Sequence, residues 1–145
     1  MRYRRVNKLS PEDAAYVAGL IDGEGTVTLS RRHATDRRQL VVSISSTEAE
    51  ILKWVLATVG TGKITRKSAT SPRHAPSLTY SISNRQALAL LEQTARFLRS
   101  YKRIRAAMVV DQYVRLTPRN GRYTKEVEAA RAAFESQLLA TKARP

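Results

Sequence analysis

The first helix of the chain is predicted by an apolar stretch with a well-defined start. Ser10 can accept a hydrogen bond from a free amide of the first turn, and Pro11 fits the first helical position. Residues 14–21 are apolar almost all round, so we expect this helix to be buried on more than one side. Gly19 and Gly23 each cost roughly 1 kcal/mol of helix propensity relative to alanine. Close approach of another helix is the simplest reason for tolerating that cost.

After Gly25 the apolar residues recur at every second position, which is typical of half-buried strands. Leu40, Val42 and Ile44 are expected to point inward, with polar neighbours pointing outward. The strands pair as two hairpins, of which the first has a turn containing four arginines. The predicted strands are residues 26–30, 39–45, 63–67 and 77–83.

Helices are predicted between and after the two hairpins. Residues 47–50 have the pattern of a capping box and begin a helix that runs to about Val59. Three further helices are expected at about 83–99, 101–116 and 125–140. The resulting order, α-β-β-α-β-β-α-α-α, predicts an α+β fold with an antiparallel sheet and helices on one face. The other face carries Thr, Ser, Lys, Gln and Arg, which suits nucleic acid, although a merely solvated face has the same composition.

Charge narrows the class of partner. The 145 residues include 26 Lys and Arg against 12 Asp and Glu, for a formal net charge of +14, which favours a polyanionic partner. The absence of cysteine excludes disulfide scaffolds, thiol catalysis and cysteine zinc fingers. His33 and His74 lack the spacing of metal ligands. No apolar run approaches the roughly 18 residues of a membrane span, so we expect a soluble, intracellular nucleic-acid binder.

Residues 17–25 read VAGLIDGEG and resemble the nine-residue signature of the LAGLIDADG homing endonucleases. Six of the nine letters agree, and the departures are Val17, Gly23 and Glu24. The signature lies where the family has it, at the end of a buried helix that is followed directly by a hairpin. The resemblance covers about residues 11–116 of a single domain, 1–145, with an additional helical extension at about 117–145. The 125–140 helix is expected to pack on the domain and not to bind DNA.

The resemblance implies a site-specific endonuclease that hydrolyses both strands of DNA with divalent metal ions. Mg²⁺ is the expected ion, with Mn²⁺ as a substitute and Ca²⁺ supporting binding without cleavage. One signature per chain implies a homodimer, a near-palindromic target and a role in intron homing. No small-molecule cofactor and no membrane partner are expected.

Catalytic roles are carried over from the family position by position. Glu24 would bind metal through its carboxylate, and Gly23 through its backbone carbonyl. Lys102 would place a cation beside the scissile phosphate, with Arg103 or Arg105 as competitors. Ser46 stands where the family often has glutamine; it would either position a water or only precede the next helix. Asp22 is expected to satisfy backbone amides, and the implied dimer interface comprises Ala15, Ala18, Gly19, Asp22 and Gly23.

The outward side chains of both hairpins are the expected DNA readers, because a two-stranded ribbon fits the major groove. Those of the first hairpin are Thr26, Thr28, Ser30, Arg32, Gln39, Val41 and Ser43. Those of the second are Lys63, Thr65, Lys67, Thr79, Ser81 and Ser83. Five further arginines lie near turns, where they could reach bases or phosphates: Arg31, Arg37, Arg38, Arg66 and Arg73.

Two alternatives remain open on the same fold. One is an intron RNA-splicing cofactor, or maturase, which would need the basic surface but no metal-dependent cleavage; the acidic Glu24 argues mildly against it. The other is a DNA-binding protein that does not cut, which Ser46 makes conceivable.

Overall fold

The computed structural model describes residues 4–67 and 76–144 and confirms the predicted order of elements. The elements are α1 (Pro11–Glu24), β1 (Gly25–Ser30), β2 (Gln39–Ser46), α2 (Ala49–Val59), β3 (Lys63–Lys67), β4 (Ser77–Ser83), α3 (Asn84–Thr94), the 3₁₀ helix η1 (Ala95–Phe97), α4 (Lys102–Gln112) and α5 (Lys125–Ala140). The fold is α+β, as predicted. Across these described residues, no helix has the length and hydropathy needed to cross a membrane.

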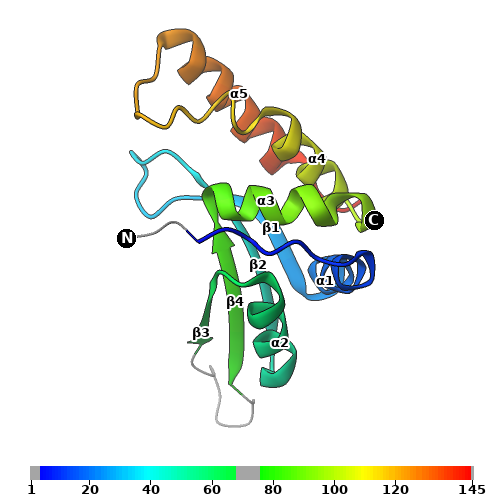
Figure 1. The fold of residues 1–145 in the computed structure, drawn as a ribbon. Coiled ribbons are helices and arrows are strands. Elements are labelled where there is room, and N and C mark those ends of the chain that lie inside the picture. Colours follow the sequence, from blue (N-terminus) through cyan, green and yellow to red (C-terminus); the bar gives the residue numbers. More distant parts are fainter. Residues whose placement is uncertain (1–3, 68–75, 145) are drawn as a thin grey trace.

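The four strands form one antiparallel sheet in the order β1-β2-β4-β3. Val27 lies opposite Val42, which in turn lies opposite Ile82, so these three side chains share a face. That face is buried under the helices, and the polar residues of the alternate positions line the other face. Figure 1 shows α2 alongside the strands and α3 across their upper end. The predicted division into a dry face and a polar face is therefore confirmed.

The junction between α1 and β1 is tight. Ser10 accepts the amide of Asp13 at 3.1 Å and so begins α1 as predicted. At the other end, a Cβ on Gly25 would lie 2.5 Å from the Ser43 carbonyl oxygen and 2.9 Å from the Ile21 Cα. Only glycine lets the end of α1 approach β2 this closely. The helix end is thereby held against the sheet.

Three predicted helix boundaries were wrong. The helix expected at about 101–116 ends at Gln112. The capping box at 47–50 is not made: Glu48 precedes α2 without a side-chain cap, and its amide donates to the Ser46 hydroxyl at 2.9 Å. The helix expected to reach residue 99 ends at Thr94, followed by η1 and an extended Leu98. The chain leaves the helix here because the next amides bind a side chain of α1, as described below.

Helix α5 packs on the domain, as predicted, with Phe134 and Leu138 buried. Buried Arg131 donates to the Arg38 carbonyl at 2.7 Å and to the Leu116 carbonyl at 2.8 Å. It also pairs with Glu135 at 3.1 Å. One guanidinium therefore joins α5 to the start of β2 and to the segment that follows α4.

Candidate catalytic centre and nucleic-acid interface

The end of α1 is fastened to the start of α4 by two side chains. Asp22 accepts the amides of Arg99 at 2.8 Å and Ser100 at 3.1 Å, and the Ser100 hydroxyl at 2.5 Å. Lys102 donates its ammonium to the carbonyls of Ile21 at 2.9 Å and Asp22 at 2.8 Å. The ammonium therefore satisfies carbonyls that a helix end leaves without partners. Asp22 satisfies backbone amides, and these amides belong to its own chain.

These contacts shift two pKa values. Burial raises the pKa of Asp22, but the Ser100 hydroxyl, the two amides and the Lys102 ammonium outweigh it and leave the pKa below its ordinary value. Burial lowers the pKa of Lys102; Asp22 raises it, Arg105 lowers it and Glu24 raises it, with a net decrease. Asp22 and Lys102 therefore interact electrostatically with each other at the end of α1.

Glu24, two residues after Asp22, is exposed, as is the neighbouring Gly23. Its side chain lines a cavity of about 400 Å³ together with Ser46, Leu20 and Ile44. The structure thus brings Glu24 and Ser46 to one cavity, and the Ser46 hydroxyl there already accepts the Glu48 amide. Lys102 is not among the residues that line this cavity; it is 8% exposed, and its ammonium donates to backbone carbonyls. This arrangement gives Lys102 a positioning contact with the helix end.

The two competitors of Lys102 differ in their surroundings. Arg105 is buried and donates to the carbonyls of Val27 at 2.9 Å and Thr141 at 2.8 Å, so it joins β1 to the end of α5. Arg103 is exposed on α4. Within residues 4–67 and 76–144, no three His, Asp or Glu side chains gather into a group that could hold a metal ion. Among the described residues that line the cavity at this end of α1, Glu24 supplies the carboxylate.

The polar face of the sheet carries most of the predicted DNA readers. Thr26 and Ser43 lie opposite each other and their hydroxyls are 2.6 Å apart. Ser45 and Thr79 form a second cross-strand pair at 2.8 Å. Ser45 was not among the predicted readers, although it lies on the same face as Ser43, two residues earlier. Paired hydroxyls of this kind hold each other in fixed rotamers on the exposed face.

A groove of about 790 Å³ lies at the end of the sheet that carries the β1–β2 turn. Most of its lining consists of predicted readers: Ser30, Arg31, Arg32, Arg37, Gln39, Val41, Lys63, Ser81 and Ser83. Four of these are cations, and Asp36 is the acidic residue of the lining. The groove is therefore a strongly cationic part of the polar face.

Several predicted readers occupy other positions. Arg37 pairs with Glu128 of α5 at 2.7 Å, and Arg38 donates to the Leu29 carbonyl at 3.3 Å. Arg66 lies opposite Leu78, on the helix side of the sheet, and is exposed. Lys67 continues β3 opposite Ser77. Arg73 lies outside the described residues.

The predicted interface residues of α1 do not all share one face. Gly19 and Gly23 are exposed, and a Cβ on either would meet nothing within 4 Å. Ala15 is half-buried. Ala18 is 0% exposed, so it presents no surface to a second chain, which corrects its assignment. The Asp22 carboxylate is likewise committed to its own chain.

Known proteins match this chain in structure but not in sequence comparisons. No protein-family model matches the sequence, and no curated protein matches it. Solved structures do match. The homing endonuclease I-CvuI, in complex with its target in the presence of Ca, aligns over 93% of this chain and 85% of its own, with a TM-score of 0.72 and 15% identity. The archaeal intron-encoded homing endonuclease I-Vdi141I, complexed with DNA, aligns over 92% and 86%, with a TM-score of 0.60 and 18% identity.

A longer protein matches as well. LAGLIDADG homing endonuclease I-GzeII, in complex with a DNA target, has a TM-score of 0.66 and 13% identity, and the alignment covers 92% of this chain but 45% of that one. The resemblance inferred from residues 17–25 is thus confirmed at the level of the structure: the chain has the fold of the LAGLIDADG homing endonucleases.

Proposed function

We propose that this chain is a site-specific DNA endonuclease that cuts both strands of a long, near-palindromic target as a homodimer, with divalent metal ions. The observation that carries the proposal is the exposed Glu24 at the end of α1, where Asp22 and Lys102 are already bonded within the chain. Within residues 4–67 and 76–144, the Glu24 carboxylate makes no hydrogen bond or ion pair that would give it a structural role. The DNA complexes of the I-CvuI and I-Vdi141I structures support DNA as the partner.

The exposed face of α1 supports a second copy of the chain. Gly19 and Gly23 have open space around them, so packing within the chain does not explain two glycines in a helix. Beside them, the exposed rings of Tyr16 and Trp54 meet edge to face at 5.0 Å. The chain covers 85% of I-CvuI but 45% of I-GzeII, so the longer protein has room for two such units. A symmetric pair along α1 would bury this surface.

A divalent ion fits the residues at this end of α1 when two copies meet. Each chain offers the Glu24 carboxylate and the Gly23 carbonyl, and hard cations such as Mg²⁺ prefer oxygen ligands. When bound, such ions activate water and stabilise the departing oxygen of an in-line displacement. The chain's own contribution is to orient these ligands: Lys102 and Asp22 hold the helix end, and Ser46 supplies a hydroxyl in the same cavity.

Substitution of Glu24 by glutamine tests the proposal. A target is first selected by binding from a library of palindromic duplexes and then incubated with Mg²⁺ or Mn²⁺. We expect the wild-type protein to cut both strands, and Glu24→Gln to bind with similar affinity but to cut at least a hundredfold more slowly, because a carboxylate ligand is lost. Ca²⁺ should support binding without cutting.

Glu92→Gln is the matched control, because Glu92 is exposed on α3. It removes the same charge and should leave the cutting rate unchanged. Cutting by Glu24→Gln at the wild-type rate would show that the catalytic residue is elsewhere. Binding of a selected duplex without cutting under any of these ions would favour the DNA-binding alternative, and preference for structured RNA would favour the maturase.

A further inference from the structure

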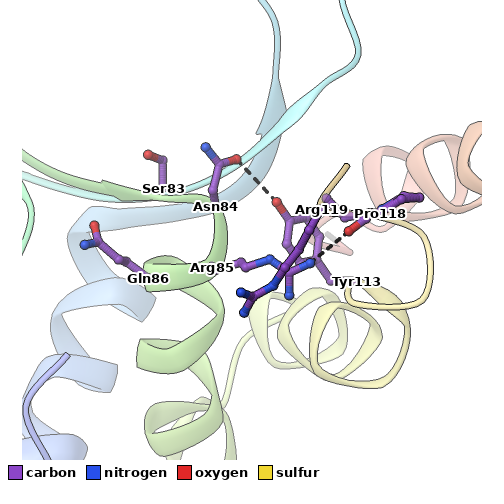
Figure 2. A pocket seen from close by; sticks show the side chains of 8 residues that line it. Ser83, Asn84, Arg85, Gln86, Tyr113, Pro118 and Arg119 are labelled. Atoms are coloured by element: carbon purple, nitrogen blue, oxygen red, sulfur yellow. Dashed lines mark hydrogen bonds between the residues drawn. The ribbon is translucent and has the colours of Figure 1, made fainter. Parts of the chain in front are cut away.

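A second cationic cavity lies next to the groove of predicted readers and contains none of them except Ser83. Its volume is about 730 Å³, and it lies between the start of α3 and the segment after α4. Figure 2 shows Arg85 reaching across from α3 and Arg119 from the opposite wall. Neither arginine was among the predicted readers, because both lie beyond the alternating pattern of the strands.

The charges of this cavity are not balanced within it. Arg85 donates to the Thr117 carbonyl at 2.9 Å, which uses one of the five donors of its guanidinium. Arg119 is exposed and makes no side-chain hydrogen bond or ion pair within the described part of the chain. No Asp or Glu is among the residues that line the cavity. Two guanidinium groups in one cavity without a carboxylate form a site for an external anion, and arginine is well suited to phosphate.

The wall of the cavity is held in place by a buried tyrosine. Tyr113 is 1% exposed and donates its hydroxyl to the side-chain oxygen of Asn84 at 3.3 Å. This bond fixes which end of the Asn84 amide is the acceptor, and Figure 2 shows the amide nitrogen on the side of Ser83. Asn84 also has a left-handed backbone, with φ of 55°. Ser83 and Asn84 thus add a hydroxyl and an amide group to the lining of the cavity that holds the two arginines.

The cavity continues the DNA-facing surface away from the catalytic end. Ser83 lines both this cavity and the 790 Å³ groove. It lies opposite Val41 near the start of β2, whereas Glu24 adjoins Gly25, which lies opposite Ile44 near the end of β2. A duplex that runs from Glu24 along the readers would reach Arg85 and Arg119 last.

We propose that the Arg85–Arg119 cavity binds a backbone phosphate of the DNA that flanks the recognised sequence. The proposal rests on the DNA-binding function above. It predicts that each subunit neutralises one phosphate outside the base pairs contacted by the hairpins. Such a contact adds affinity without sequence preference, because phosphates carry no base information.

Ethylation interference on the selected target, with flanks longer than the footprint of the readers, tests this directly. In the wild-type protein, ethylation of one outer phosphate per half-site should block binding. Arg119→Ala should remove interference at that phosphate alone, weaken binding several-fold and lower the salt slope by about 0.9 per subunit. Arg119 is the primary variant because it is exposed. Arg85→Ala should likewise remove interference at this phosphate. Because this variant also loses the contact with the Thr117 carbonyl, its melting temperature is measured as well.

Arg115→Ala is the charge-matched control. Arg115 is exposed, pairs with Asp111 at 3.7 Å and lies outside the cavity, so its removal should leave the interference pattern unchanged. An Arg119→Ala pattern identical to wild type on a bound target would overturn this inference alone. Absence of any bound duplex would instead count against the proposed function. If Arg119→Ala weakens binding of inorganic phosphate but not of the flanked duplex, the cavity binds a free anion and the inference is wrong.

Discussion

Asp22 and Glu24 are separated by one residue, yet their carboxylates have different surroundings. Asp22 accepts three hydrogen bonds from residues 99 and 100, whereas Glu24 is exposed beside Gly23. The first carboxylate holds two segments of the chain together, and the second remains available to a ligand. This division follows from the direction in which each side chain leaves the end of α1.

Asp22→Asn should destabilise the protein in a pH-dependent way. The pKa of Asp22 in the folded chain lies below its ordinary value, so its charge stabilises the fold above roughly pH 4 and this contribution is lost as the pH falls through the folded pKa. In urea unfolding, the variant should be less stable than wild type at pH 7, and the difference should shrink by pH 3. Asp111→Asn, at an exposed ion pair, should show little difference at either pH. A constant difference for Asp22→Asn would mean that the charge itself does not contribute.

Helix α5 acts as a clamp on the first hairpin. Arg131 donates to carbonyls at the start of β2 and after α4, and Glu135 accepts from it while lying 3.7 Å from Arg38. Near the turn of the hairpin, Arg37 pairs with Glu128 and stacks on Tyr123 with 3.7 Å between guanidinium and ring centre. Figure 1 shows α5 beginning close to the β1–β2 turn. The position of the β1–β2 turn, which carries several of the proposed readers, therefore depends on a helix that contributes none of them.

Removal of this clamp should cost stability. Arg131→Ala leaves two buried carbonyls and a carboxylate without their partner, and we expect a loss of about 3 kcal/mol in the free energy of unfolding. Arg131→Lys keeps the charge but not the planar fork of donors, so its free energy of unfolding should lie between those of the wild type and of Arg131→Ala. Urea unfolding gives the measurement, with exposed Arg122→Ala as the control near zero. A loss below about 0.5 kcal/mol for Arg131→Ala would show that α5 is not fastened by this residue.

Local patterns predict the elements of this fold well and its long-range contacts poorly. The alternation of Val27, Leu29 and Val42 with polar neighbours identifies strands and their buried face, and glycines 19, 23 and 25 locate the signature helix end. The early end of α3 could not be predicted, because the amides that follow bind Asp22, 77 residues away. The pairing of Arg66 with Leu78 agrees with the predicted alternation of β3, but alternation alone does not say which groups the exposed guanidinium can reach.

The candidate site shows the same limit. Glu24 and Gly23 were found through the nine-residue signature, and Lys102 through its place after the second hairpin. What no short pattern contains is the direction of the Lys102 ammonium, which lies on the carbonyls of Ile21 and Asp22. Arg85 and Arg119 were missed for a similar reason, since their shared cavity exists only after α3 and the segment beyond α4 come together.

Assembly of two chains along α1 is tested by filling the space beside Gly19. A Cβ there meets nothing within 4 Å, and leucine has the higher helix propensity, so Gly19→Leu should leave the fold of each chain intact. It should nevertheless weaken the dimer more than tenfold and abolish cutting, as measured by sedimentation and by cleavage of the selected duplex. Ala132→Leu, on the exposed side of α5, adds the same kind of bulk elsewhere and should leave both unchanged. A wild-type protein that is a monomer on DNA would refute the assembly.

The distribution of charge over two such chains determines how binding responds to salt. Each chain carries a net charge of +14, and four of its cations line the groove on the polar face: Arg31, Arg32, Arg37 and Lys63. Neutralised phosphates release their counterions, so the logarithm of affinity should fall linearly with the logarithm of salt concentration, by about 0.9 per phosphate. Six or more phosphates correspond to a slope steeper than about −5. Glu128 pairs with Arg37, which lines the groove, and its negative charge opposes an approaching phosphate, so Glu128→Gln should raise affinity at low salt. A nearly flat salt response of the wild-type protein would exclude phosphate contacts as the main source of affinity.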